Sequence, residues 1–144
     1  MDARWIPLLA AALGVLGGVG GAAVGGSVAN SGQSQRLQEE RITEVQDLLI
    51  ATYAEFQGAA DNYAISWGIA EEKFSGESER LEFVKPQLDE LFRTAAAVEL
   101  VANPQVMDAA DKLRNELGGG DPKDYEILRN SFIRLAREEI EALQ

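Results

Sequence analysis

The chain has 144 residues, with 13 Lys and Arg against 24 Asp and Glu, so its formal net charge at neutral pH is −11. This acidic balance argues against nucleic-acid binding, which needs clustered cations to displace phosphate counterions. The chain contains no Cys and no His, and this excludes His- or Cys-based catalytic triads, the usual zinc sites, haem ligation through His and redox thiols. We therefore expect no enzymatic activity and no cofactor.

Residues 1–30 are predicted to form a transmembrane anchor. Residues 7–28 are almost entirely Leu, Ala, Val and Gly, and the uncharged stretch continues to Gln35. As a helix rising about 1.5 Å per residue, residues 7–28 would span roughly 33 Å, close to a hydrocarbon core of about 30 Å. The alternative is a secretory signal peptide cleaved after Ala29. The uncharged stretch is longer than a signal-peptide core of about 7–15 residues, which favours a retained anchor.

Small residues recur every four positions within this segment. Gly17, Gly21 and Gly25 form one series, and Gly14 and Gly18 begin a second. This spacing places them along one side of a helix, where the backbone of a partner helix can approach closely. The pattern predicts lateral association in the bilayer, either with another protein or as a homo-oligomer, although Gly and Ala are common in membrane helices in general.

Residues 31–34 (Ser-Gly-Gln-Ser) are predicted to be a short polar joint, and residues 35–144 an acidic helical-bundle domain. A long helix is expected over residues 35–74, because apolar and small side chains fall at seven-residue intervals in two registers. Such a face has the width expected of a helix in a bundle or coiled coil. The first register holds Ile42, Leu49, Phe56, Tyr63 and Ala70, and the stripe is widened by Tyr53, Ala60 and Trp67.

A second helix is expected to start after Ser78, which would cap its first, acidic turn. Pro86 lies inside this helix and removes one backbone N–H, so we expect a kink or a break there. The helix should end before Asn103 and Pro104, which together are typical of a helix start and open a third helix.

Residues 118–120, all Gly, are expected to stop the third helix, and Asp121 with Pro122 to start the last one. No stretch alternates with period two for long enough to form a strand. The sequence therefore predicts an all-α fold, with one N-terminal transmembrane helix followed by an antiparallel bundle of about four helices.

Glu99 is the one acid in an otherwise apolar run, residues 94–102. A buried carboxylate is costly unless it is paired. We therefore expect Glu99 to form a buried ion pair with Arg129, Arg134 or Arg137 of the last helix, and of these we predict Arg134. The alternative is an acid with a raised pKa in a pocket.

Tyr53, Tyr63 and Trp67 lie on one side of the first helix of the bundle. They are interpreted as core residues. The alternative is that they form an aromatic pocket for a ligand or a contact surface for a partner helix.

Several short motifs give the chain a family resemblance. They are Tyr53-Ala-Glu-Phe56 followed by Ala-Ala-Asp at residues 59–61, Val-Glu-Leu-Val-Ala-Asn-Pro at residues 98–104 leading to Ala109-Ala110, and Phe132 with Ala136-Arg137-Glu138. With these motifs the chain resembles a group of uncharacterised small membrane-anchored helical proteins of actinobacteria. The resemblance implies an anchor followed by a helical domain in the cytoplasm, but no activity and no functional residues.

Charge alone leaves the membrane topology close to a tie, with Arg4 on one side of the predicted anchor and Arg36 and Arg41 on the other. The sequence thus predicts a single-pass cell-membrane protein, with its soluble domain in the cytoplasm, that serves as an interaction scaffold or accessory protein. Its partners would be the lipid bilayer and a protein bound through the anchor or the acidic bundle. Two alternatives are a membrane-tethered ligand-sensing bundle with a pocket near Tyr63 and Trp67, and a secreted helical protein.

Overall fold

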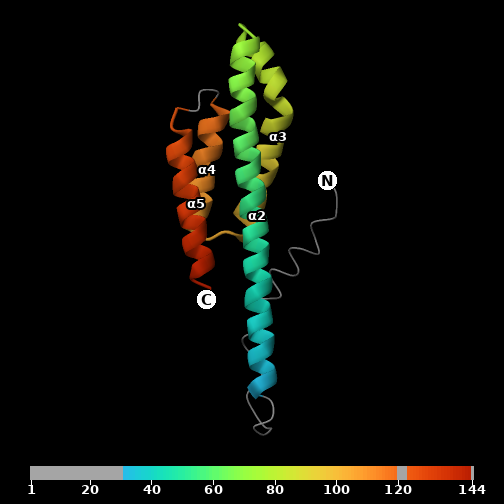
Figure 1. Ribbon diagram of the computed structural model, residues 1–144, viewed down its shortest axis with the longest axis vertical. Helices are drawn as coiled ribbons and strands as arrows, with labels where there is room; N and C mark the ends of the chain where they lie inside the picture. Colours follow the sequence, from blue (N-terminus) through green and yellow to red (C-terminus); the bar gives the residue numbers. More distant parts are fainter. Residues whose placement is uncertain (1–30, 120–122, 144) are drawn as a thin grey trace. The chain divides into compact units, whose positions relative to one another are not determined.

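The computed structural model describes residues 31–119 and 123–143, and this part of the chain is entirely helical, with no strand (Figure 1). The helices are α2 (Ser31–Lys73), α3 (Glu77–Val101), α4 (Pro104–Gly118) and α5 (Tyr125–Glu141). The predicted all-α fold is confirmed for these residues.

The predicted anchor, residues 1–30, lies outside the described residues, and so do the small residues expected on its face. Those residues are Gly14, Gly17, Gly18, Gly21 and Gly25. Within the described ranges, no helix combines the length and the apolar character needed to cross a membrane.

The expected polar joint at residues 31–34 is helical and forms the start of α2. Gly32 is the one poor helix former among these four residues, and a single Gly costs a helix only about 1 kcal/mol relative to Ala. Backbone contacts divide the chain into the units Met1–Gln38 and Glu39–Gln144, and the bundle belongs to the second unit.

Consecutive helices of the bundle run antiparallel. Tyr53 of α2 packs on Phe132 of α5, while Asp61, two turns further along α2, binds Arg129. Residue numbers therefore rise along α2 as they fall along α5, and Figure 1 shows α3 returning beside α2 and α5 returning beside α4. Within the described residues, α4 packs along both α5 and α3.

The stripe of α2 packs into the core as predicted, except at its start. Leu49, Phe56, Tyr63 and Ala70 are buried, but Ile42 is 43% exposed. The reason is the length of the neighbouring helix. The end of α5 reaches α2 at Gln46, whose side chain donates to the carbonyl oxygen of Ile140, and residues 36–44 are all exposed.

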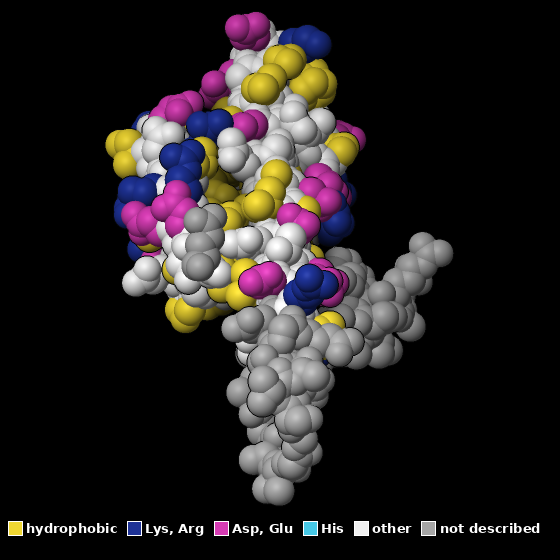
Figure 2. All heavy atoms as spheres, turned by 60° about the horizontal axis from the view of Figure 1, so that its bottom comes forward, with side chains coloured by type: hydrophobic (Ala, Val, Ile, Leu, Met, Phe, Trp, Pro, Cys, Tyr) yellow, Lys and Arg dark blue, Asp and Glu magenta, His cyan; other side chains and the backbone are white. Residues whose placement is uncertain are grey.

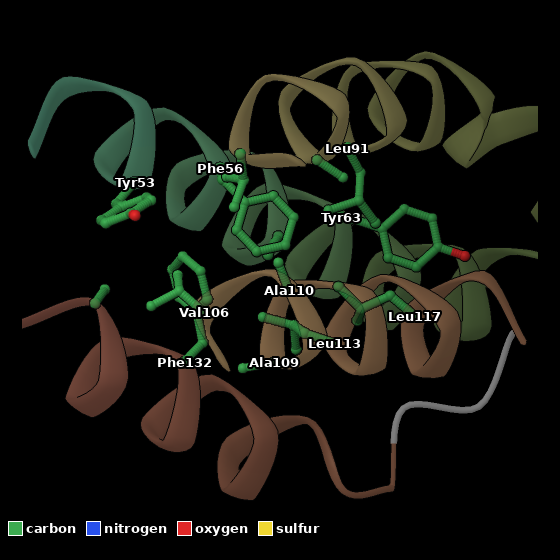
Figure 3. Close-up of a cluster of buried hydrophobic side chains, with 14 of the residues drawn as sticks. Tyr53, Phe56, Tyr63, Leu91, Val106, Ala109, Ala110, Leu113, Leu117 and Phe132 are labelled. Carbon is green, nitrogen blue, oxygen red and sulfur yellow. The ribbon is translucent and has the colours of Figure 1, made fainter. Parts of the chain in front are cut away.

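Figure 3 shows the centre of the core, where aromatic side chains from α2 meet Phe132. Phe132 has its ring 4.9 Å from that of Phe56 and 5.8 Å from that of Tyr53, and both pairs are edge-to-face. Such pairs contribute about 0.5–1.5 kcal/mol beyond the burial of their area. Ala109 and Ala110 are buried on α4, and their small side chains allow α4 and α5 to lie close together.

The expected start of α3 was wrong, and so was the expectation of a break at Pro86. The helix begins at Glu77 with Gly76 at the N-cap position and no side-chain cap, so Ser78 lies inside the first turn. The helix also continues through Pro86 without a break. Pro86 is exposed, so the carbonyl group that loses its N–H partner can hydrogen-bond to water instead.

The start of α4 is the one predicted: the Asn103 side chain accepts hydrogen bonds from the backbone N–H groups of Gln105 (2.9 Å) and Val106 (3.0 Å), with Pro104 in the first turn. The last helix starts later than expected. It begins at Tyr125 with Asp124 at the N-cap position, while residues 121 and 122 lie outside the described residues.

Replacing the α4 cap should destabilise the bundle. We expect Asn103→Ala to lower the free energy of unfolding by about 1 kcal/mol, since two N–H groups lose their acceptor. Urea unfolding of the full chain, followed by circular dichroism, measures this loss. Asn115→Ala, an exposed change in the same helix, is the matched control and should have less effect. Equal losses in the two variants would show that the cap does not stabilise α4.

Candidate functional site

An open groove of about 450 Å³ lies between α2 and α5 in the described part of the chain. In Figure 2, hydrophobic side chains fill the hollow between these two helices, and charged side chains flank it. The lining residues from α2 are Ile50, Tyr53, Ala54 and Gln57, and those from α5 are Phe132, Ile133, Ala136, Arg137, Ile140 and Glu141. We call this feature the α2–α5 groove.

The floor of the α2–α5 groove is the edge-to-face pair of Tyr53 and Phe132, both buried. The Tyr53 hydroxyl donates to Oε2 of Glu139 at 2.5 Å. Burial, together with the neighbouring Glu139 carboxylate, raises the pKa of Tyr53, so the hydroxyl remains protonated. Because it is already hydrogen-bonded, the floor presents an apolar ring to the groove.

Glu139 connects three segments of the bundle. Its Oε2 accepts from Tyr53 of α2, and its Oε1 accepts from the backbone N–H of Asn103, at 2.9 Å, in the junction between α3 and α4. One carboxylate of α5 therefore holds both the first helix and the start of α4, which fixes the walls of the groove.

A second polar cluster joins α2 to α5 nearer the start of α5. Asp61 accepts from the Tyr125 hydroxyl and from Nε of Arg129, the latter at 2.8 Å. Burial alone would raise the pKa of Asp61, but the hydrogen bonds from Arg129 and Tyr125 and the charge of Arg129 outweigh it and lower the pKa. Asp61 is therefore an ionised structural partner.

The outer face of α2, opposite its core stripe, carries apolar and small side chains that are exposed: Ala51, Ala54, Gly58, Ile65 and Ile69. Ile65 is 62% exposed, and a Cβ atom placed on Gly58 would meet nothing within 4 Å. Ala54 belongs both to this outer face and to the lining of the α2–α5 groove, so the two surfaces adjoin.

Charges around these surfaces are unevenly distributed. Every charged residue of α2 between Glu44 and Glu72 is acidic. Arg129 binds Asp61, and Arg93 approaches Glu55 at 3.9 Å. The other α2 acids in this stretch, which are Glu44, Asp47, Glu71 and Glu72, have no ion-pair partner among the described residues. On the α5 side, Arg137 is likewise unpaired within the described part.

The ion pair expected between Glu99 and Arg134 is not formed. Glu99 is 41% exposed and pairs with Nη1 of Arg114 of α4 at 2.8 Å, while Arg134 pairs with Glu138, one turn further along α5, also at 2.8 Å. Glu99 lies on the side of α3 that faces α4, so Arg114 is the nearer cation. Leu100, its neighbour, is also exposed, which shows that residues 94–102 are not buried all round.

Tyr53, Tyr63 and Trp67 are all buried, and of these only Tyr53 lines the α2–α5 groove. Sequence reasoning missed the α5 side of the groove. The available signal was the spacing of Ile133, Arg137 and Ile140, which places these residues side by side on a helix, next to its core stripe.

No group of three acidic side chains among the described residues could hold a metal ion. Comparisons with protein-family models, curated proteins and solved structures give no match to this chain. The candidate function therefore depends on the geometry of the bundle and on the predicted anchor.

Removing the Asp61 carboxylate should change how stability depends on pH. The pKa of Asp61 is lowered in the folded state, so its stabilising effect is present above its unfolded pKa of about 3.9 and is lost as the pH falls through the folded value. We expect Asp61→Asn to be less stable than the original chain at pH 7, with a difference that shrinks towards pH 3.

Urea unfolding at a series of pH values measures this difference. Asp89→Asn removes an exposed carboxylate of α3, and serves as the control. A pH-independent difference for Asp61→Asn would contradict the role given to the Arg129 and Tyr125 contacts.

Proposed function

We propose that the protein is a single-pass, membrane-anchored interaction module whose bundle docks a helix of a partner protein. The docking surface is the α2–α5 groove together with the adjoining outer face of α2. The observation that carries this proposal is the α2–α5 groove, with exposed aliphatic side chains in it and beside it and a core that is already complete without them.

The exposed aliphatic side chains support a docking role because they do not contribute to the core. Ile50 in the groove is 50% exposed and Ile65 on the outer face is 62% exposed. Single exposed apolar residues need no explanation, but a contiguous set beside a groove is typical of an interaction site. Residues 51, 54, 58, 65 and 69 follow helical spacing, which suits a partner helix laid along α2.

The charges around the surface indicate the chemistry of the partner. The charged side chains that α2 itself offers a docked helix between Glu44 and Glu72 are all acidic, and only Asp61 and Glu55 have an arginine nearby, so cationic side chains on the flank of the partner helix are favoured. A second copy of α2 would instead bring acid against acid. On the other side of the groove, Arg137 favours one acidic residue on the partner. We therefore infer a mainly basic amphipathic helix.

The predicted anchor, residues 1–30, would hold this module at the cell membrane. We propose that the bundle lies in the cytoplasm, as the actinobacterial resemblance implies. Tethering would hold the docking surface close to partners in the same membrane, which raises their effective concentration. The Gly17, Gly21 and Gly25 series would provide a second contact within the bilayer.

Ligand sensing is the second candidate, because the volume of the α2–α5 groove lies within the range of about 300–1,000 Å³ typical of ligand sites. The groove is open, however, and the Tyr53 hydroxyl on its floor is already bound to Glu139. Few polar groups are left to orient a small molecule, which favours a helix as the occupant.

A catalytic role receives no support from the polar clusters of the bundle. The Asp61 carboxylate is bound by Arg129 and has a lowered pKa, which is the opposite of what a general acid requires. We therefore propose binding without catalysis.

Site-specific photo-cross-linking in intact cells tests the docking surface. Ala54 belongs both to the α2–α5 groove and to the outer face of α2. A photoreactive residue in its place should form a discrete adduct with another protein. The control position is Asn115, exposed on α4, which should give no such adduct. Adducts to a second copy of the chain, or the same adducts from both positions, would contradict the proposal.

A further inference from the structure

Five buried side-chain polar atoms in the described part of the bundle have no hydrogen-bond partner in the protein, and two of them belong to the ion pair of Asp111 with Arg114. The other three have no ion pair either. They are the hydroxyl oxygen of Tyr63, Nε1 of Trp67 and Oε1 of Gln87. Buried Oδ1 of Asp111, by contrast, lies 3.0 Å from Arg114 in an ion pair. Because buried polar groups in folded proteins are nearly always paired, with protein or with ordered water, these three atoms need a partner.

The pairing of α2 with α3 places the stretch of α3 that contains Gln87 opposite Tyr63 and Trp67. Tyr63 and Trp67 are one turn apart on α2, with rings stacked at 6.2 Å. Along the antiparallel pair, Phe74 meets Phe83, and Glu55 approaches Arg93. The stretch of α3 opposite Tyr63 and Trp67 thus lies between residues 83 and 93, which includes Gln87.

The surroundings of these atoms are otherwise apolar. Val84 and Leu91, one turn on either side of Gln87, are fully buried in the same core. Figure 3 shows the Tyr63 hydroxyl on the side of its ring away from Phe56 and Leu91. Neither of these side chains can accept its proton.

The hydrogen-bonding capacities of the three atoms define the occupant. The Trp67 indole can only donate, Oε1 of Gln87 can only accept, and a tyrosine hydroxyl can do both. A cation is excluded by the indole N–H, and an anion by the Gln87 oxygen. Water accepts two hydrogen bonds and donates two, and buried waters typically make about three.

We propose that a buried water molecule binds between α2 and α3, accepting from the Trp67 indole, donating to Gln87 and bonding to the Tyr63 hydroxyl. Burial raises the pKa of Tyr63, so the hydroxyl keeps its proton and can take part as donor. None of the three residues Tyr63, Trp67 and Gln87 lines the α2–α5 groove. The proposed water site is therefore independent of the proposed docking function.

Nuclear magnetic resonance of the full chain tests the site directly. The variant Trp67→Phe identifies which indole N–H signal belongs to Trp67 and which to Trp5. The Trp67 indole N–H should show a rotating-frame Overhauser cross-peak to water. This dipolar cross-peak has the opposite sign to a peak that arises from chemical exchange. Gln87→Leu should abolish this cross-peak, because the water loses its acceptor. Absence of the dipolar cross-peak in the original chain would overturn the proposal.

A double-mutant cycle provides a second measurement. If one water joins the two side chains, Tyr63→Phe and Gln87→Leu together should cost less stability than the sum of the single changes. The control cycle pairs Tyr63→Phe with Thr94→Val, since the buried Thr94 hydroxyl already bonds to carbonyl oxygens of α3 itself, and it should be additive. Additivity in the Gln87 cycle would also overturn the proposal.

Discussion

The packing of α5 on α2 is the constraint on which the rest of the bundle depends. Phe132 contacts both Tyr53 and Phe56, and the Glu139 carboxylate, two turns further on, joins Tyr53 to the start of α4. These contacts set the register of the first helix against the last, the pair with the greatest separation in sequence. Because their large rings fill the space between the helices at the level of the core, the smaller side chains outside them, such as Ala54 and Ala136, leave the α2–α5 groove open.

The helices themselves could be predicted because their signals are local. Seven-residue spacing identified the buried stripe of α2, and Asn103 followed by Pro104 identified the start of α4. Errors arose where solvent or a distant segment decides the outcome. Pro86 does not break α3 because its position is exposed, and Glu99 pairs with Arg114 because α3 and α4 are neighbours. Neither fact is contained in the spacing of residues along one helix.

The groove was not predictable for the same reason. Ile50 and Ile133 read as ordinary positions at the margins of two separate stripes, and only the pairing of α2 with α5 brings them to one surface. The polar interior between α2 and α3 shows a related effect. Tyr63 and Trp67 were recognised as core residues or pocket residues. That no protein group bonds to their polar atoms emerges only when the surrounding atoms are known.

In the proposed function, the α2–α5 groove holds a helix from a partner protein. The most direct measurement is the size of the complex extracted from membranes for the double variant Ile50→Glu with Arg137→Glu, compared with Ile127→Glu. Ile50 and Ile127 are both well exposed, and Arg137 is exposed as well, so folding should be preserved in both variants. We predict that the groove variant loses the partner's mass while Ile127→Glu retains it. Retention of the full mass by the groove variant would contradict the claim.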